Sequence, residues 1–285
     1  MPNSRQRSRT RAISEFSQVA PGPQDPDARA AVRGGLQQLS LRSTLLVWLG
    51  VAGPMAILVW IVWPMLSTVT SMNPGMLFWL LMTCGMIWQF VFSLILLRQE
   101  LGTLRWSVVA PRIWAQQPRD PRTGNPRPRL WWMLIPIAAA FAVLTLTSDL
   151  LTSLMEAVGL TELTGASISG LADPAFTGQW WIFAVAVISF VFNYALGEEL
   201  FFRGVLLPRM QGVFGRWDWL ANAALFTIYH TQKLWTLPIV LLTALPFSWA
   251  ARRYRTIWFA VILHAIEGVV VLVLVFAVVS GLAFS

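Results

Sequence analysis

Long apolar runs fill most of the sequence after residue 43, and they limit the folds that are open to the chain. Seven runs can be distinguished, at residues 44–66, 76–97, 131–155, 179–206, 218–235, 236–251 and 256–282. A helix needs roughly 20 apolar residues to cross the hydrocarbon core of a bilayer. Inside the bilayer each span must satisfy its own backbone polar groups, which favours helices. The pattern predicts an all-α, polytopic transmembrane bundle of about seven helices.

Composition agrees with this fold class. The 285 residues are 56% hydrophobic and 12% charged, with a mean hydropathy of +0.61. Soluble domains have roughly a quarter of their residues charged. The net charge of +8 comes almost wholly from arginine, and the arginines lie between the apolar runs. This placement indicates membrane topology and contact with anionic membrane lipids, and we expect no nucleic-acid partner.

The arginines also predict how the chain is organised and oriented. Residues 1–43 are polar, basic and rich in proline, which predicts a disordered tail. Residues 44–155 hold three predicted helices and a basic loop at 98–130. With seven helices every arginine-rich segment falls on one side of the membrane, the later ones being Arg209 with Arg216 and Arg252 with Arg253 and Arg255. The positive-inside rule then predicts a multi-pass protein of the cell membrane with a cytoplasmic N-terminus.

A few ionisable side chains interrupt the apolar runs, and such residues are costly in a membrane unless they serve a function. They are Glu198, Glu199 and Arg203 in the fourth run, His230 in the fifth, and His264 and Glu267 in the last. The two histidines are the only ones in the chain. One interpretation is that both are core histidines with hydrogen-bond partners. A shared functional site is the alternative that we favour.

The depths of these residues are compatible with a shared site. At about 1.5 Å per residue, Glu198 and His264 lie about 13 and 12 Å above the cytoplasmic ends of their helices, and His230 about 18 Å above its own. We therefore expect Glu198, His230 and His264 to face one cavity.

Spacing along the helix gives the two acids different roles. Adjacent residues of an α-helix point about 100° apart. Glu199 and Arg203 are i,i+4 neighbours in the favourable orientation, so they form a predicted ion pair. Glu198 has no intrahelical partner, which suits a general base or acid. The histidines could share its proton, hold a water molecule, or join it around a metal.

Three motifs in this region resemble those of the CPBP family of intramembrane proteases, which are relatives of the type II CAAX prenyl endopeptidase (Rce1-like, or Abi, family). The chain has Glu198-Glu-Leu-Phe-Phe-Arg203, then Phe226-Thr-Ile-Tyr-His230, then His264-Ala-Ile-Glu-Gly268. The resemblance covers roughly residues 179–275 and implies that residues 156–285 form a catalytic transmembrane domain. It further implies that Glu198 and His230 activate a water, that His264 stabilises the oxyanion, and that Glu199 and Arg203 support their helix. The substrate would be a membrane-anchored protein or peptide.

One motif position departs from the family pattern. The third motif ends on asparagine in the family, and that residue is thought to help the histidine bind the oxyanion, whereas this chain has Gly268. Glu267 could compensate as a supporting residue, or the glycine could admit a water. The departure leaves open a non-catalytic scaffold or immunity partner of the same fold. A proton-coupled transporter is another alternative, because buried Glu, His and Arg also form proton relays.

The resemblance also leaves open whether the site binds a metal ion. Two histidines and a glutamate could bind Zn²⁺ with a free coordination position, and the ligands would be Glu198, His230 and His264. The sequence has no His-Glu-x-x-His motif, and its candidate ligands lie on three separate helices. We therefore prefer a reaction that requires no cofactor.

Overall fold

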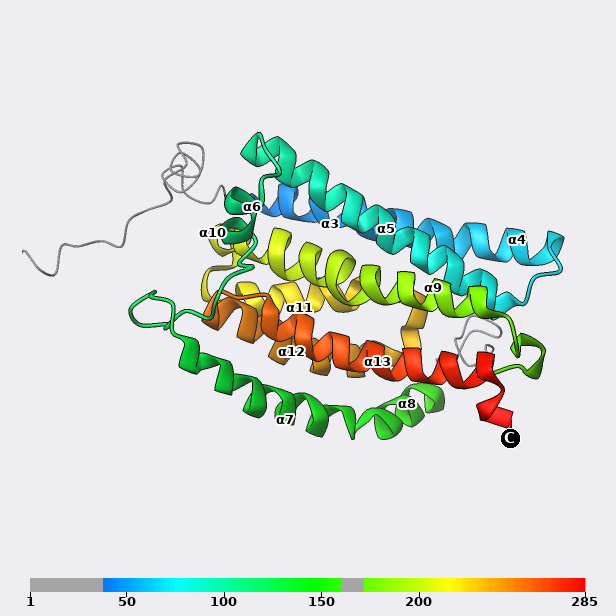
Figure 1. The fold of residues 1–285 in the computed structure, drawn as a ribbon. Coiled ribbons are helices and arrows are strands. Elements are labelled where there is room, and N and C mark those ends of the chain that lie inside the picture. The colour runs from blue at the N-terminus through cyan, green and yellow to red at the C-terminus, as the bar shows by residue number, and fades with distance from the viewer. Residues whose placement is uncertain (1–37, 160–171, 285) are drawn as a thin grey trace, which may run out of the picture.

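The computed structural model describes residues 38–159 and 172–284, and their regular structure is helical throughout (Figure 1). The predicted all-α transmembrane bundle is confirmed. Five helical stretches are long and apolar enough to cross a membrane, at residues 41–69, 74–101, 128–157, 231–254 and 258–280, which makes this a multi-pass membrane protein. The tail predicted for residues 1–43 lies, up to residue 37, outside the described residues.

The first two spans form an antiparallel pair. The first contains α3 (Leu41–Ile57), the π-helical segment η1 (Leu58–Val62) and α4 (Trp63–Val69), and the second is α5 (Pro74–Leu101). Asn73 caps α5 by accepting hydrogen bonds from the backbone N–H groups of Gly75 and Met76. Gly85 lets the two spans approach closely, since a Cβ there would lie 2.5 Å from the terminal methyl of Met55.

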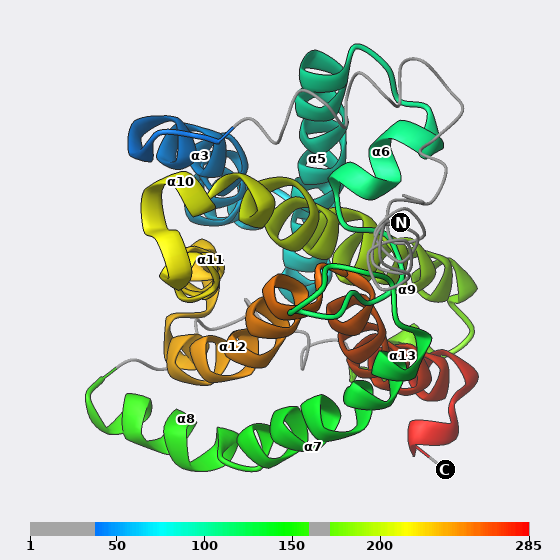
Figure 2. The ribbon, with the colours of Figure 1, turned by 90° about the vertical axis from the view of Figure 1, so that its left-hand side faces the viewer.

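The third span lies on the outside of the bundle (Figures 1 and 2). It follows the short helix α6 (Trp106–Arg112) and consists of η2 (Pro128–Met133), α7 (Leu134–Thr145) and α8 (Ser148–Ala157). The ring of Phe141 stacks on that of Phe247 in α12, with centroids 5.0 Å apart. Because little else covers α7, its outer face is left for lipid.

The fourth predicted span, residues 179–206, is called the fourth span below. It is not a regular α-helix, although the sequence suggested one. It begins as α9 (Trp180–Val191) and continues through two π-helical segments, η5 (Phe192–Gly197) and η6 (Leu200–Leu206), which flank Glu198 and Glu199. Gly197 permits this winding, since a Cβ there would lie 2.2 Å from the Phe192 carbonyl oxygen. Single π turns occur often at functional sites. Three short helices complete the turn, namely η7 (Leu207–Arg209), α10 (Gln211–Phe214) and η8 (Gly215–Trp217).

The fifth predicted span, residues 218–235, is broken. Helix α11 (Asp218–Tyr229) has 12 residues, about 18 Å of helix, and it ends just before His230. The 3₁₀ segment η9 (Thr231–Thr236) follows, with Lys233 outside helical geometry. The chain then returns as α12 (Leu237–Tyr254) and crosses again as α13 (Trp258–Ser280), followed by η10 (Leu282–Phe284). The break places His230 at a helix end inside the bundle, where its side chain has room to turn toward Glu198.

A buried ionic cluster ties together the helix ends that the sequence assigns to the cytoplasmic side. Glu100 at the end of α5 accepts from Arg112 of α6 at 2.7 Å, and its second carboxylate oxygen pairs with Arg209 of η7. Arg209 also donates to the Val205 carbonyl. Because both cations share one carboxylate, this end of the bundle is fixed by charge as well as by apolar packing.

Candidate active site

A cavity of about 870 Å³ lies between the fourth span and α5, α7, α11, α12 and α13, within the membrane-spanning part of the bundle. Most of its lining is apolar. Its titratable side chains include Glu198, His230, His264 and Glu267. A mostly apolar cavity with a few convergent polar groups is the usual form of a ligand or substrate site.

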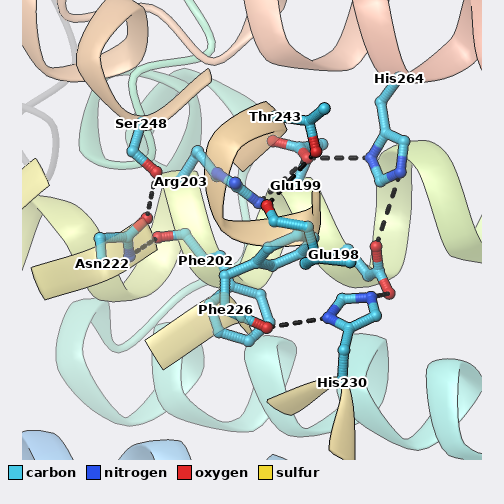
Figure 3. Close-up of polar contacts among 11 residues, drawn as sticks. Glu198, Glu199, Phe202, Arg203, Asn222, Phe226, His230, Thr243, Ser248 and His264 are labelled. Carbon is cyan, nitrogen blue, oxygen red and sulfur yellow. Dashed lines mark hydrogen bonds and ion pairs between the residues drawn. The ribbon is translucent and has the colours of Figure 1, made fainter. Parts of the chain in front are cut away.

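Glu198 lies between the two histidines (Figure 3). Its Oε1 atom is 3.6 Å from Nε2 of His230, and its Oε2 atom is 3.7 Å from Nε2 of His264. Glu198 is only 3% exposed. Both distances are somewhat longer than a direct hydrogen bond. The structure thus brings together the three side chains that the sequence singled out, from the fourth span, the end of α11 and α13.

A backbone carbonyl determines which ring nitrogen of His230 carries the proton. Its Nδ1 atom lies 2.8 Å from the Phe226 carbonyl oxygen, one helical turn earlier. A carbonyl can only accept, so Nδ1 carries the proton that it donates. In the neutral ring Nε2 then has a free lone pair, and this lone pair faces Glu198. Both groups on this side of the cavity are therefore acceptors when Glu198 is ionised.

Glu199 has two partners, and the sequence predicted only one of them. Its Oε1 atom accepts from Nη1 of Arg203 at 3.1 Å, as the i,i+4 spacing predicted. The same oxygen lies 3.0 Å from Nδ1 of His264. Since the Arg203 charge keeps Glu199 an acceptor, His264 donates from Nδ1 and turns Nε2 toward Glu198. Glu199 therefore contacts Nδ1 of the His264 ring and Glu198 faces Nε2 of the same ring, although the two glutamates are adjacent in sequence.

Aromatic rings surround the rest of the Arg203 side chain. The guanidinium carbon lies 4.1 Å from the centroid of the Phe226 ring, a cation–π distance. Arg203 is fully buried, and its Nε and Nη2 atoms have no hydrogen-bond partner among the described residues. Phe226 thus serves the site twice, because its ring covers Arg203 and its carbonyl fixes the tautomer of His230. This explains why a phenylalanine four residues before the histidine is useful here.

Side chains of the fourth span fill the space beside Gly268. A Cβ on Gly268 would lie 2.4 Å from two ring carbons of Tyr194 and 2.7 Å from a ring carbon of Phe190. The Tyr194 ring also contacts His264 edge to face, with centroids 4.8 Å apart. The space beside Gly268 is therefore taken by a phenol ring and is not left open for a water. Glu267 lines the cavity but makes no hydrogen bond or ion pair with the described residues.

Two contributors to the site were missed from sequence. Tyr194 lies within the apolar run at 179–206 and carries no charge, although it precedes Glu198 by one turn and lines the cavity. Asn222 donates to the Phe202 carbonyl at 2.8 Å and accepts from the Ser248 hydroxyl at 3.0 Å (Figure 3). It thereby ties the π-helical segment η6 to α11 and α12. The available signal was spacing, since Asn222 lies four residues before Phe226 on the same helix face.

Glu198, His230 and His264 were also the candidate metal ligands of the sequence. No group of three or more His, Cys, Asp or Glu side chains within residues 38–159 and 172–284 is arranged to hold a metal ion.

Comparison with known proteins shows one similarity, and it covers the segment that contains this site. A search of the curated proteins and a search of the solved structures each found no match. A family model described as type II CAAX prenyl endopeptidase Rce1-like matches residues 179–270. The matched segment begins just before α9 and runs into α13, so it contains both glutamates and both histidines. Residues 179–270 are therefore similar to the Rce1-like type II CAAX prenyl endopeptidases.

Proposed function

We propose that this protein is an intramembrane endopeptidase that hydrolyses peptide bonds of membrane-associated proteins or peptides. The observation that carries the proposal is the placement of a buried glutamate between two imidazole nitrogens in a cavity at membrane depth. The match to the Rce1-like family supports the same class of reaction.

The geometry suggests how a water would be activated. Glu198 and Nε2 of His230 are both acceptors, so one water can donate a hydrogen bond to each and direct its lone pair at a substrate carbonyl. As the water oxygen adds to the carbonyl carbon, its proton passes to Glu198 and the carbonyl electrons move onto oxygen. Collapse of this intermediate breaks the C–N bond, and Glu198 returns the proton to the leaving amine. A cofactor is not required for any of these steps.

Charge on the oxyanion needs a donor on the opposite side of the cavity. Nε2 of His264 is one candidate when the ring is doubly protonated, because Nδ1 donates to Glu199 and Nε2 then carries the second proton. We assign the Tyr194 hydroxyl as a second hydrogen-bond donor to the oxyanion. Its ring fills the volume that a side chain at position 268 would take, and it packs on His264. Tyr194 would thus supply the polar group that Gly268 lacks.

Replacing Tyr194 with phenylalanine tests this assignment. The ring and its packing against Gly268 and His264 are kept, and only the hydroxyl is removed. We expect the rate of cleavage to fall about a hundredfold, the usual lower range for loss of one oxyanion donor, with little change in KM. The measurement is kcat and KM for a membrane peptide in detergent micelles. An unchanged kcat would show that the phenol only fills space.

Gly268→Asn provides a matched control for that prediction. Asparagine at 268 alone forces the Tyr194 ring to move, because a Cβ there comes within 2.4 Å of it. We expect this variant to lose stability and activity. Combining it with Tyr194→Ala removes the closer of the two rings and leaves only the Phe190 ring, 2.7 Å from that Cβ, to shift, so the double variant should be more active than Tyr194→Ala alone. If the asparagine gives no gain in that background, the two positions do not share a role.

A cleavage assay tests the function itself. The purified full-length protein is incubated with a library of membrane-spanning peptides, beside the variant His230→Ala. We expect cleavage by the parent protein and a loss of about 10²–10⁴-fold in the variant, because the water loses one of its two acceptors. Activity that survives a strong chelator would support hydrolysis without a metal, whereas its loss would contradict it. Absence of cleavage across a broad library would favour a non-catalytic member of the family.

We also propose that the protein lies in the cell membrane with its N-terminus in the cytoplasm. The start of α3, the ends of α5 and α12 and the arginines of the intervening segments lie at one end of the bundle, the end that faces the viewer in Figure 2. An excess of arginine at one end marks the cytoplasmic side.

A further inference from the structure

A second hollow, separate from the candidate active site, lies at the arginine-rich end of the bundle. Its volume is about 450 Å³, and it is formed by the loop at 119–124, the start of α11 and the end of α12. Two tryptophans line it, Trp219 and Trp249. Six arginines also line it, namely Arg119, Arg122, Arg216, Arg252, Arg253 and Arg255. We call this hollow the arginine pocket.

The arginine pocket has far more positive charge than its own residues balance. Asp120 is the acid in its lining, and its carboxylate is bound by Arg127, which lies outside the lining. Arg252 pairs with Asp218. Arg122, Arg253 and Arg255 are exposed and pair with no acidic side chain among the described residues. Several cations of the pocket are therefore not offset by any acidic side chain that the structure describes.

Arg119 shows the effect of this imbalance. Its guanidinium donates to neutral oxygens, the Gly124 carbonyl and the Gln116 side chain, both at 2.9 Å. Burial, and after it the nearby charge of Arg255, lower the pKa of Arg119. Neither of these two cations forms an ion pair with an acidic side chain within residues 38–159 and 172–284.

The backbone that carries these arginines is fixed in place. Arg119 donates from its backbone N–H to the Tyr254 carbonyl at 2.8 Å, and the Thr256 hydroxyl donates to the Gln116 carbonyl at 2.7 Å. Arg255 ends α12 in the left-handed region, with φ 48° and ψ 49°, at a position where glycine is the common choice. A non-glycine residue in this conformation is uncommon, and such strained residues cluster at ligand sites. The guanidinium groups are thus presented by a rigid turn.

The location of the pocket indicates the kind of anion. It lies where α12 ends and α13 begins, at the ends of two membrane spans. Tryptophan is enriched at this level of a membrane protein, where lipid headgroups meet water. Basic pockets between transmembrane helices on the cytoplasmic side are typical sites for anionic lipid headgroups. Trp249 and the lipid-facing side of α12 would contact the acyl chains of a lipid but offer nothing to a free anion.

We propose that the arginine pocket binds the phosphate headgroup of an anionic phospholipid of the cytoplasmic leaflet. The phosphate oxygens would accept from Arg253, Arg255 and Arg122, which have no acidic partner in the described structure. The lipid would also brace the active-site helices, because Arg252 of the pocket holds Asp218, the first residue of α11, and α11 ends next to His230. This proposal does not depend on the proposed reaction.

The pocket variant for the test is Arg253→Gln with Arg255→Gln. Its matched control is Arg42→Gln with Arg129→Gln, which removes the same charge from exposed positions of the same end outside the pocket lining. If the pocket variant does not fold, Arg122→Gln on the exposed loop replaces it. Folding of each variant is checked by its thermal midpoint in phosphatidylcholine alone.

Native mass spectrometry of the full-length protein then measures retained phosphatidylglycerol, with phosphatidylcholine and inorganic phosphate as comparison ligands. We expect one tightly held phosphatidylglycerol in the parent protein. The pocket variant should bind it roughly thirty-fold more weakly, at the usual contribution of an arginine near an anionic surface, while the control loses less than about threefold. Equal losses in both variants would overturn the proposal, since a general surface charge would then suffice. Inorganic phosphate binding as tightly as the lipid would overturn the lipid as the ligand.

Discussion

The Glu198→Gln variant is expected to hydrolyse membrane peptides about 10²–10⁴-fold more slowly than the parent protein. Glutamine keeps the size of the side chain and one acceptor oxygen, but it replaces the other oxygen with an NH₂ donor and cannot take a proton from water. The other acceptor, Nε2 of His230, is 3.6 Å away and would remain in place. The loss therefore reports proton transfer. The measurement is single-turnover cleavage in proteoliposomes, which separates the chemical step from product release.

Two controls make the Glu198→Gln result interpretable. Glu156→Gln carries the same chemical change on the exposed end of α8, away from the cavity, and should cleave at the parent rate. The thermal midpoint of Glu198→Gln should not fall, because Glu198 has no Lys or Arg partner in the described residues and its removal leaves no cation unpaired. Activity within tenfold of the parent protein would exclude Glu198 as the general base.

Arg203→Met is expected to lower the free energy of unfolding by about 3–5 kcal/mol. The arginine is completely buried, and its removal leaves the Glu199 carboxylate without its cation in the protein interior. The packing of its guanidinium on Phe226 is lost as well. The measurement is reversible unfolding in mixed detergent micelles. A loss below about 1 kcal/mol would show that His264 alone suffices as the partner of Glu199.

A double-mutant cycle separates the ion pair from the packing. Glu199→Gln with Arg203→Met removes both charges, so the double variant should be more stable than Arg203→Met alone. If instead the two losses simply add, the pair has no coupling energy and Arg203 stabilises the site through aromatic packing. Lys233→Met serves as the charge-matched control, since Lys233 lies in η9 and forms no ion pair in the described structure.

Much of the chemistry of the site could be predicted from spacing. The i,i+4 separation predicted the pair of Glu199 and Arg203, and that pair is present at 3.1 Å. Helix depth suggested that Glu198, His230 and His264 could share a cavity, and all three line the cavity of the candidate active site. The contact between Glu199 and His264 could not be predicted this way, because 65 residues separate the two and the contact depends on how α13 packs. Their catalytic roles stay predictions.

The sequence by itself determined that this is a helical membrane protein with a few buried ionisable groups, because hydrophobic length and charge placement act locally along the chain. Tertiary structure alone decided what stands beside Gly268. The chain could have placed a water or Glu267 there, and packing between α13 and η5 placed the Tyr194 ring there instead. The same holds for the π-helical winding around the glutamates and for the end of α11 at His230. Each depends on which backbone atoms neighbouring helices bring close, and no local pattern of residues encodes that.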